Sequence, residues 1–309
     1  MKLQDITLAD LRLSPLAVPP VARHADLSLN RANNAALVRH LEQGGIRFLM
    51  YGGNANLYQA RVSEYEALLS MLAEFAGPET WVIPSVGPDF GKILDQVPVI
   101  RRLRFPTAMV LPYVGPMTRR GLLDGLRRFS DLLGKPFVLY IKNDDYLAPA
   151  EVRALIDERR ILAIKYAAVH ADPADDRYLR ALLTEVPPEY LISGIGERPA
   201  LVHLQEFGLN SFTTGSGCVA PRASAEMLKA IQARDWARAR ALRECFIALE
   251  DLRDANSPIQ VLHDAVSAVV ADMGPAMPFL SNADEAEMPP IRAAASALKA
   301  VNDRLLETA

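Results

Sequence analysis

Cysteine and histidine are scarce in this chain of 309 residues. The two cysteines, Cys218 and Cys245, form no CxxC pair, which fits a reduced, cytoplasmic protein without a disulfide framework. The five histidines show no HxxxH or HxH spacing, so we predict no metal site. The net charge is −3, so the chain has no excess of positive charge to neutralise the phosphates of a nucleic acid. This argues against nucleic-acid binding. No apolar run approaches the about 20 residues that span a bilayer, so we predict no membrane segment.

Apolar residues, by contrast, make up 50% of the chain and exclude a disordered protein. Over the first two thirds, short apolar runs alternate with longer amphipathic segments. Alternating strand and helix patterns predict a parallel sheet, and eight such units predict a (β/α)8 barrel, a TIM barrel of the α/β class. The expected strands are residues 14–18, 46–51, 81–86, 107–111, 137–140, 161–166, 190–193 and 211–214. The expected helices between them are residues 30–43, 62–75, 91–103, 118–133, 149–157, 175–183 and 199–207.

The pattern changes near Pro221, after which no strand is expected. Helical patterns occupy residues 223–234, 236–254, 258–272 and 290–305, and residues 274–290 form a proline-rich loop. The first of these helices closes the barrel. We therefore predict a barrel over residues 1–234 and a C-terminal helical region over residues 235–309.

Lys165 is the single charged residue in the apolar run 161–167. Burial in a barrel strand disfavours the charged form of the amine and lowers its pKa. The neutral form, which is the nucleophile, then becomes more populated. Such an amine forms an imine with a carbonyl substrate. The ordinary alternative is a lysine whose amine reaches solvent from the end of the strand.

Tyr140 ends the expected strand that precedes the Lys165 strand. Because adjacent strand ends lie close together, a phenol there is placed to relay protons to the amine or to a substrate. Packing at the rim of the core is the alternative. Lys142 lies two residues further on the same side by strand parity and is a competing imine-forming lysine, although the polar residues 143–145 predict a solvated loop.

Gly52, Gly53 and Asn54 follow the second expected strand. Glycines let backbone N–H groups approach an anion and asparagine adds a donor, so this segment is a candidate cradle for a carboxylate. An ordinary turn is the alternative. The segment is not GxGxxG, so no dinucleotide site is predicted.

Small hydroxyl residues end the last two expected strands. Thr213, Thr214 and Ser216 lie at the eighth strand and Ser193 at the seventh, where barrels often bind polar substrate groups. We predict that they contact a polar substrate chain, with a glycine-rich exit turn as the alternative.

Taken in order, these strand ends resemble the dihydrodipicolinate synthase/N-acetylneuraminate lyase family of Schiff-base barrels, over roughly residues 10–290. The most specific parts are Leu139-Tyr140 with Ile164-Lys165, together with Phe212-Thr213-Thr214-Gly215. The resemblance implies that Lys165 forms an imine with a 2-oxo acid and that Tyr140 shuttles protons. It also implies a homotetramer and no metal or organic cofactor. The C-terminal helices could equally serve a homodimer.

Within that family, the 5-dehydro-4-deoxyglucarate dehydratase branch is the most similar. Its Gly-Gly-Thr-Gly-Glu-Phe-Phe segment aligns with residues 52–58, where Asn54 replaces the threonine of the proton relay. An amide hydrogen-bonds but does not readily pass a proton. Tyr113 takes the position of a relay tyrosine after the fourth strand. Asp144 and Asp145 stand where the synthases have an arginine, and these acids would repel a dicarboxylate.

We therefore predict an imine-forming lyase that acts on a 2-oxo acid of the 2-oxo-3-deoxy sugar acid type. Loss of water and cleavage of a C–C bond both remain open, and the branch resemblance favours a dehydratase. The alternative is a catalytically impaired barrel that binds a 2-oxo acid as a sensor or partner subunit. An approach of the Lys165 amine to Tyr140 would favour the enzyme, whereas a Lys165–carboxylate pair would favour the binding protein.

Overall fold

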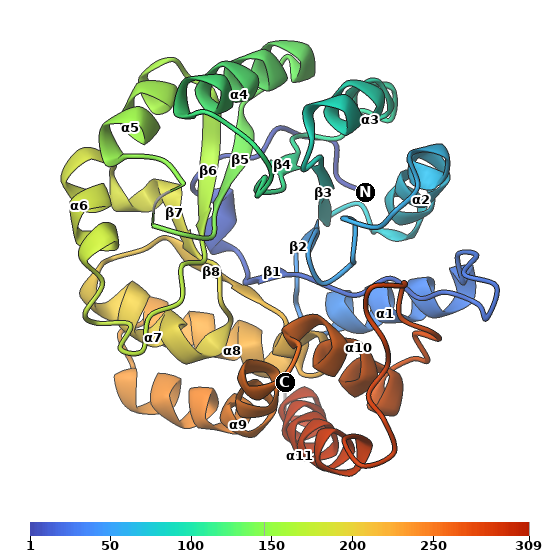
Figure 1. Cartoon of the computed structure of the whole chain (residues 1–309). Helices are drawn as coiled ribbons and strands as arrows, with labels where there is room; N and C mark the ends of the chain where they lie inside the picture. The colour runs from blue at the N-terminus through green and yellow to red at the C-terminus, as the bar shows by residue number, and fades with distance from the viewer. Residues whose placement is uncertain (145, 309) are drawn as a thin grey trace.

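Eight parallel strands close into a barrel in the computed structural model, which describes residues 1–144 and 146–308 (Figure 1). Each strand pairs with the next along the chain, and the first pairs with the last. The predicted (β/α)8 fold is therefore confirmed. The strands are β1 (Leu16–Ala17), β2 (Phe48–Tyr51), β3 (Trp81–Val86), β4 (Met109–Val110), β5 (Phe137–Ile141), β6 (Ile161–Tyr166), β7 (Leu191–Ser193) and β8 (Ser211–Thr214).

The strands are almost entirely buried because side chains fill the barrel and helices cover its outside. The largest shortening against the predicted strands is in β1 and β4, which each pair over only two residues where the sequence predicts five. Prolines lie on both sides of each, at positions 15 and 19 and at positions 106 and 112. Proline lacks the N–H that a ladder needs, so it limits the pairing to the residues between.

Eight helices alternate with the strands and form the outer ring (Figure 1). Side-chain caps begin several of them: Asn30, Asp89, Thr118 and Asp176 each accept an N–H three residues on. The helices are α1 (Arg31–Gln43), α2 (Val62–Phe75), α3 (Phe90–Arg102), α4 (Arg119–Leu133), α5 (Pro149–Asp157), α6 (Arg177–Glu185), α7 (Glu197–Glu206) and α8 (Pro221–Gln232).

Helix α7 begins two residues before the start that Pro199 predicted. The carboxylate of Glu250, far along the chain, accepts the N–H groups of Glu197 (3.0 Å) and Arg198 (2.8 Å). These bonds satisfy two of the backbone N–H groups in the first turn, which have no acceptor within the helix. The cap comes from another helix, so local sequence did not indicate it.

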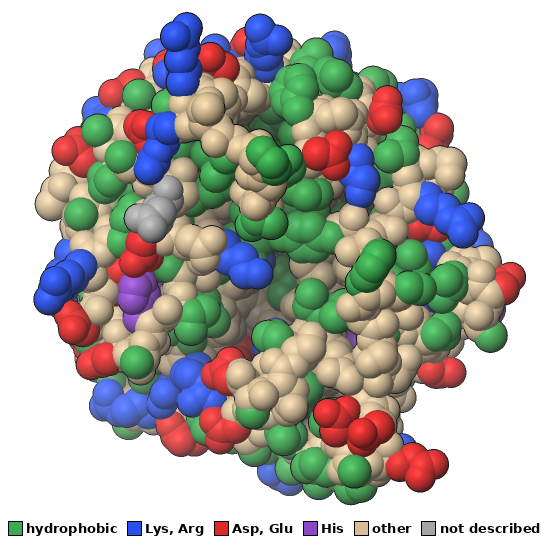
Figure 2. Space-filling view, in the orientation of Figure 1, with side chains coloured by type: hydrophobic (Ala, Val, Ile, Leu, Met, Phe, Trp, Pro, Cys, Tyr) green, Lys and Arg blue, Asp and Glu red, His purple; other side chains and the backbone are tan. Residues whose placement is uncertain are grey.

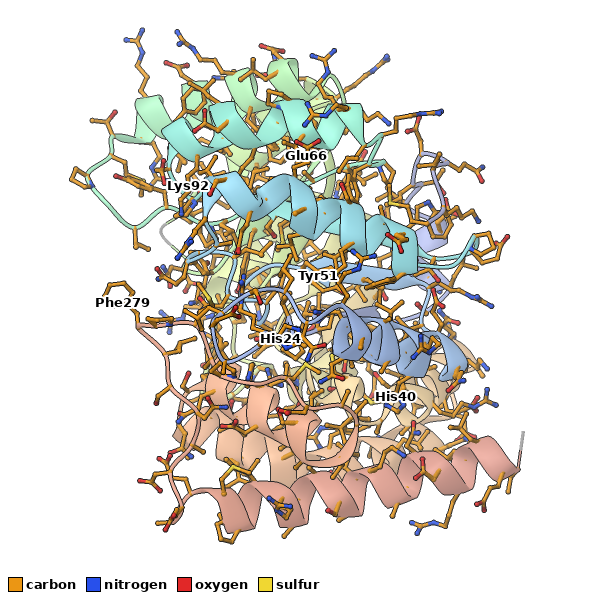
Figure 3. The ribbon with its side chains drawn as sticks, turned by 90° about the vertical axis from the view of Figure 1, so that its right-hand side faces the viewer. His24, His40, Tyr51, Glu66, Lys92 and Phe279 are labelled. Carbon is orange, nitrogen blue, oxygen red and sulfur yellow. The ribbon has the colours of Figure 1, made fainter. Side chains whose placement is uncertain are left out.

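Three further helices follow the barrel: α9 (Trp236–Ala255), α10 (Pro258–Val269) and α11 (Met288–Glu307). Figure 3 shows them as a layer along one side of the barrel, with the loop that carries Phe279 reaching the end of the barrel where Lys92 lies. Helix α9 packs against α7 and α8 as well as α10 and α11. Among the described residues, no helix has the length and apolar character needed to cross a membrane.

Candidate active site

A cavity of about 260 Å³ opens at the carboxyl ends of the strands. In the view down the barrel, Figure 2 shows the surface hollowed near the centre, with a basic side chain at the edge of the hollow. This end of a (β/α)8 barrel carries the active site in characterised enzymes of the fold. The polar side chains and glycines that line the cavity are Gly53, Asn54, Tyr58, Tyr140, Lys142, Lys165, Gly194, Gly196, Arg198, Thr213, Gly215, Glu250, Arg253, Asp254 and Ser257.

Lys165 enters this cavity from β6. Its side chain is only 5% exposed, and its Nζ lies 4.4 Å from the centroid of the Tyr140 ring. The two residues are paired in the β5–β6 ladder, so their side chains point to the same face of the sheet. Gly194, after β7, makes room for the lysine: a Cβ there would meet Lys165 Cγ at 3.0 Å and the Tyr166 carbonyl oxygen at 2.6 Å.

The environment of Lys165 favours its neutral amine. Burial, followed by the nearby cations Lys142 and Arg253, lowers the pKa of the amine to about 7. No carboxylate of the described residues lies within 4.0 Å of the amine. Lys165 therefore exists as neutral and charged amine in comparable amounts near neutral pH, and the neutral form is a nucleophile.

Tyr140 supplies a protonated hydroxyl to the same cavity. Burial, followed by the neighbouring Tyr58, raises the pKa of the Tyr140 phenol above its ordinary value. Burial also raises the pKa of Tyr58 to about 12. Both phenols are therefore protonated at neutral pH and are placed to donate a proton.

The segment after β2 forms one wall of the cavity. The Asn54 side-chain amide donates to the Val18 carbonyl (3.0 Å), which fixes the amide against β1. The hydrogen bonds among the described residues leave the N–H groups of Gly53 and Asn54 unused. Lys92 of α3, labelled in Figure 3, donates to the Tyr58 carbonyl (2.9 Å) and holds the far end of the segment.

Gly52 lies behind this wall and does not line the cavity. A Cβ at Gly52 would meet Met109 Cε at 2.7 Å and Ser85 Oγ at 2.9 Å. Close packing against the side chains of β3 and β4 therefore favours glycine at this position.

The hydroxyl residues of β7 and β8 divide between two faces. Thr213 lines the cavity. Ser216, in the turn after β8, does not line it, but its Oγ accepts a hydrogen bond from the cavity residue Arg253 (3.2 Å). Ser193 and Thr214 point away from the cavity, toward the helices: Ser193 Oγ lies 2.8 Å from His203 Nδ1, and Thr214 donates to Glu197 (2.5 Å). These two side chains support the barrel wall and do not reach the cavity.

Tyr113 lies elsewhere. It lines a separate cavity of about 340 Å³ between α3 and α4, together with Tyr146. The described residues thus bring Lys165 and Tyr140 together, but they do not bring Tyr113 to the same cavity. Its role as a relay remains a prediction from the family resemblance.

Asp144 also faces away from the cavity. His170 Nε2 lies 3.4 Å from Asp144 Oδ1 and 3.3 Å from Asp176 Oδ2. These ligand atoms lie close enough to hold a metal ion, but Asp176 is already bound by the Tyr166 hydroxyl (2.5 Å) and the Leu179 N–H (2.8 Å). The sequence suggested that Asp144 would face and repel a dicarboxylate substrate. Because Asp144 does not line the cavity, that expectation is wrong for this residue. Asp145 lies outside the described residues.

The polar groups of the cavity that sequence reasoning missed include Tyr58, Arg198, Glu250 and Arg253. Tyr58 falls in the segment aligned with the dehydratase branch, so its position was a usable signal. Arg198 begins α7, and the other two belong to α9, whose sequence has no chemical motif. Only the packing of α9 on the barrel shows which of its residues reach the site.

Glu250 forms a buried acid pair with Glu197. Burial raises the pKa of both carboxyl groups, that of Glu250 to about 8. Glu197 Oε1 accepts from Thr214 (2.5 Å) and Ser224 (2.7 Å). The charge of Glu197 adds to burial in raising the pKa of Glu250, so the pair resists holding two negative charges beside the cavity.

Comparison with protein-family models and with curated proteins finds no match. Solved structures do match over nearly the whole chain. The dihydrodipicolinate synthase from Oceanobacillus iheyensis has 18% identity and a TM-score of 0.82, covering 94% of this chain and 96% of its own. YagE from E. coli K12, a prophage protein of the dihydrodipicolinic acid synthase family crystallised with pyruvate, has 21% identity and a TM-score of 0.76, covering 94% and 98%. A Ruminococcus gnavus sialic acid aldolase has 12% identity and a TM-score of 0.81, covering 95% and 99%.

The molecule is thus a (β/α)8 barrel with a buried lysine beside a tyrosine at the carboxyl ends of its strands. Its fold is the one shared by dihydrodipicolinate synthases and a sialic acid aldolase. At these identities the likeness establishes the fold, and the chemistry must be argued from the cavity itself.

Proposed function

We propose that this protein is an imine-forming lyase that acts on a 2-oxo acid. The observation that carries the proposal is the buried Lys165 amine, which has a pKa lowered to about 7 and lies 4.4 Å from the Tyr140 ring centroid. A lysine held in this way is a nucleophile for ketones. A lysine kept for structural reasons would be expected to pair with a carboxylate.

The reaction begins when the neutral Lys165 amine attacks the C2 carbonyl of the substrate. The carbonyl oxygen takes up a proton to give a carbinolamine, which loses water to leave a protonated imine. Tyr140 is the group placed to donate and recover that proton. The imine then accepts the electron pair released when a C–H or C–C bond of the substrate breaks.

We expect the substrate carboxylate to bind at the segment after β2 that forms one wall of the cavity. The N–H groups of Gly53 and Asn54 are unused within the described chain and belong to cavity-lining residues. Successive backbone N–H groups in a turn bind anions. Thr213 of β8 supplies another hydroxyl to the cavity and would contact the substrate chain.

The family resemblance extends the proposal to a 2-oxo-3-deoxy sugar acid and to dehydration, with aldol cleavage as the competing outcome. The crystallisation of YagE with pyruvate supports a 2-oxo acid as the substrate class. The resemblance also supports a cytoplasmic homotetramer or homodimer, which sedimentation velocity would distinguish.

Borohydride trapping tests the proposal. The protein is incubated with pyruvate and with a panel of 2-oxo-3-deoxy sugar acids, reduced, and analysed by intact mass and peptide mapping. We expect the mass of one reduced adduct on Lys165, and none in Lys165→Ala.

Lys142→Ala is the matched control, because Lys142 lines the same cavity and is the competing amine. It should still form the adduct. An adduct on Lys142 would show that Lys142, and not Lys165, forms the imine. No adduct with any 2-oxo acid would contradict the enzyme and favour a barrel that only binds such an acid.

A further inference from the structure

Arg253 of α9 reaches across to the ends of β7 and β8. Its Nη1 donates to Ser216 Oγ (3.2 Å) and its Nε to the Pro258 carbonyl (3.3 Å). The guanidinium lies directly on Gly215, where a Cβ would meet Nη2 at 2.6 Å. Glycine at position 215 therefore leaves the space that this side chain occupies.

The carboxylates around Arg253 are already engaged. Arg198 pairs with Asp251 and with Asp254, the latter at 3.1 Å between Nε and Oδ2. Both oxygens of Glu250 accept N–H groups at the start of α7. Within residues 1–144 and 146–308, no carboxylate lies within 4.0 Å of the Arg253 guanidinium. Its positive charge therefore faces the cavity without a direct partner.

The position of Arg253 relative to the reacting groups is fixed by the barrel. Lys165 on β6 and the Gly53 segment after β2 lie four strands apart in a ring of eight, which is across the barrel from each other. Arg253 lies to one side, over β7 and β8. Arg253 lines the same cavity and is near enough to the Lys165 amine to lower its pKa, so we expect the far end of a substrate held at Gly53 and Lys165 to extend toward it.

We propose that Arg253 binds a second anionic group at the far end of the substrate, so that the preferred substrate is a 2-oxo acid with a distal carboxylate or phosphate. The inference rests on the proposed function, because it uses the Lys165 imine to fix one end of the molecule. A guanidinium offers parallel N–H donors that match both anions. A volume of about 260 Å³, just below the range of drug-sized pockets, limits the substrate to a small metabolite.

Two pairs of compounds test this proposal. In each pair the chain is the same and only the far end differs: 2-oxoadipate against 2-oxohexanoate, and 2-oxo-3-deoxygluconate 6-phosphate against 2-oxo-3-deoxygluconate. The concentration for half-maximal borohydride trapping on Lys165 is measured for all four. We expect the anionic member of at least one pair to be favoured by about tenfold or more, the size typical of a hydrogen bond to a charged group.

Arg253→Gln should abolish that preference, expressed as the ratio between the two members of each pair. The loss of a cation near Lys165 changes the amine pKa for both members alike and therefore cancels in the ratio. Arg240→Gln, which removes the same charge from the exposed side of α9, is the matched control and should keep the preference. A preference that survives in Arg253→Gln, or the lack of one in the wild type for both pairs, would overturn the inference. Circular dichroism confirms that the variants are folded, and Arg253→Lys, which retains the charge, should keep part of the preference.

Calorimetric titration of Lys165→Ala separates this inference from the proposed function. This variant forms no imine, so binding of 2-oxoadipate and its loss in the Lys165→Ala/Arg253→Gln double variant depend on the anion contact alone. If no compound is trapped but this difference is found, the proposed lyase fails and the anion site stands. If trapping succeeds and the double variant binds 2-oxoadipate as Lys165→Ala does, the anion site fails and the lyase stands.

Discussion

At the scale of single residues, the charge of Lys142 controls how much of the Lys165 amine is neutral. Lys142 is the largest contributor after burial to the lowered pKa of Lys165. Removing a nearby cation stabilises the protonated amine, so its pKa rises. In Lys142→Gln we expect the pH profile of imine trapping to move to higher pH and the rate at pH about 7 to fall severalfold. Lys135→Gln, whose lysine pairs with Asp5 instead, should leave the profile in place.

Tyr140 has two separable parts, its ring and its hydroxyl. The ring lies beneath the Lys165 amine, and the hydroxyl is the proposed acid and base. Tyr140→Phe keeps the ring, so we expect imine trapping to persist. Turnover should fall about 10²–10⁴-fold, the usual contribution of general acid–base catalysis. Steady-state rates on a trapped substrate check this, and unchanged turnover would assign the proton transfer to another group such as Tyr58.

The pairing of strands explains which strand-end residues could be predicted. Lys165 could be predicted because it is the only charge in an apolar run. The alternation of side chains along a strand likewise predicts that Thr213 and Thr214 lie on opposite faces of β8. Alternation alone does not say which face is inside. The register does: Lys165 pairs with Ile192, which pairs with Ser211, and this places Thr213 on the inner face and Thr214 on the outer one.

At the scale of elements, the acid pair joins α7, β8, α8 and α9. Because burial raises the pKa of Glu197 and brings that of Glu250 to about 8, the folded pair holds more protons than the unfolded chain. Its stabilisation is complete below the ordinary glutamate pKa and is lost as the pH rises through about 8. We expect the Tm of the wild type to fall by several degrees between pH about 6 and 9.

Glu197→Gln should remove most of this decline. Glutamine is the neutral counterpart of the protonated acid: its oxygen can still accept from Thr214 and Ser224, and its amide does not titrate. Glu74→Gln, which alters an exposed ion pair with Arg31, is the matched control. Thermal melts at several pH values test this. A Glu197→Gln variant whose Tm declines as steeply as that of the wild type would show that the acid pair does not cause the decline.

Elements were predictable where their signals are local. The helices from Asn30, Asp89 and Thr118 begin at side-chain caps written in the sequence, and prolines account for the ends of β1 and β4. The start of α7 was not local, because its cap is Glu250 of α9. The same long-range packing brings Arg253 to the cavity. The position of Arg253 in the site could therefore not be predicted from local sequence either.

At the scale of the whole molecule, the C-terminal helices share a core with the barrel. Phe212 of β8 lies in one buried cluster with Met227 of α8 and Leu242 of α9. Residues 235–309 were predicted as a separate region because strands stop before them, and that division remains a prediction about the sequence pattern. A shared core implies cooperative unfolding, whatever the pattern along the chain.

We therefore expect one unfolding transition for barrel and C-terminal helices together. In a Trp236→Phe background, fluorescence reports the buried Trp81 of β3, while circular dichroism reports all the helices. The two denaturant curves should coincide. Leu249→Ala, at a fully buried position of α9, should lower the free energy of unfolding by about 2–5 kcal/mol in both signals. If only the dichroism curve shifted, α9 would unfold independently, and Glu250 and Arg253 would then be too weakly held to shape the cavity.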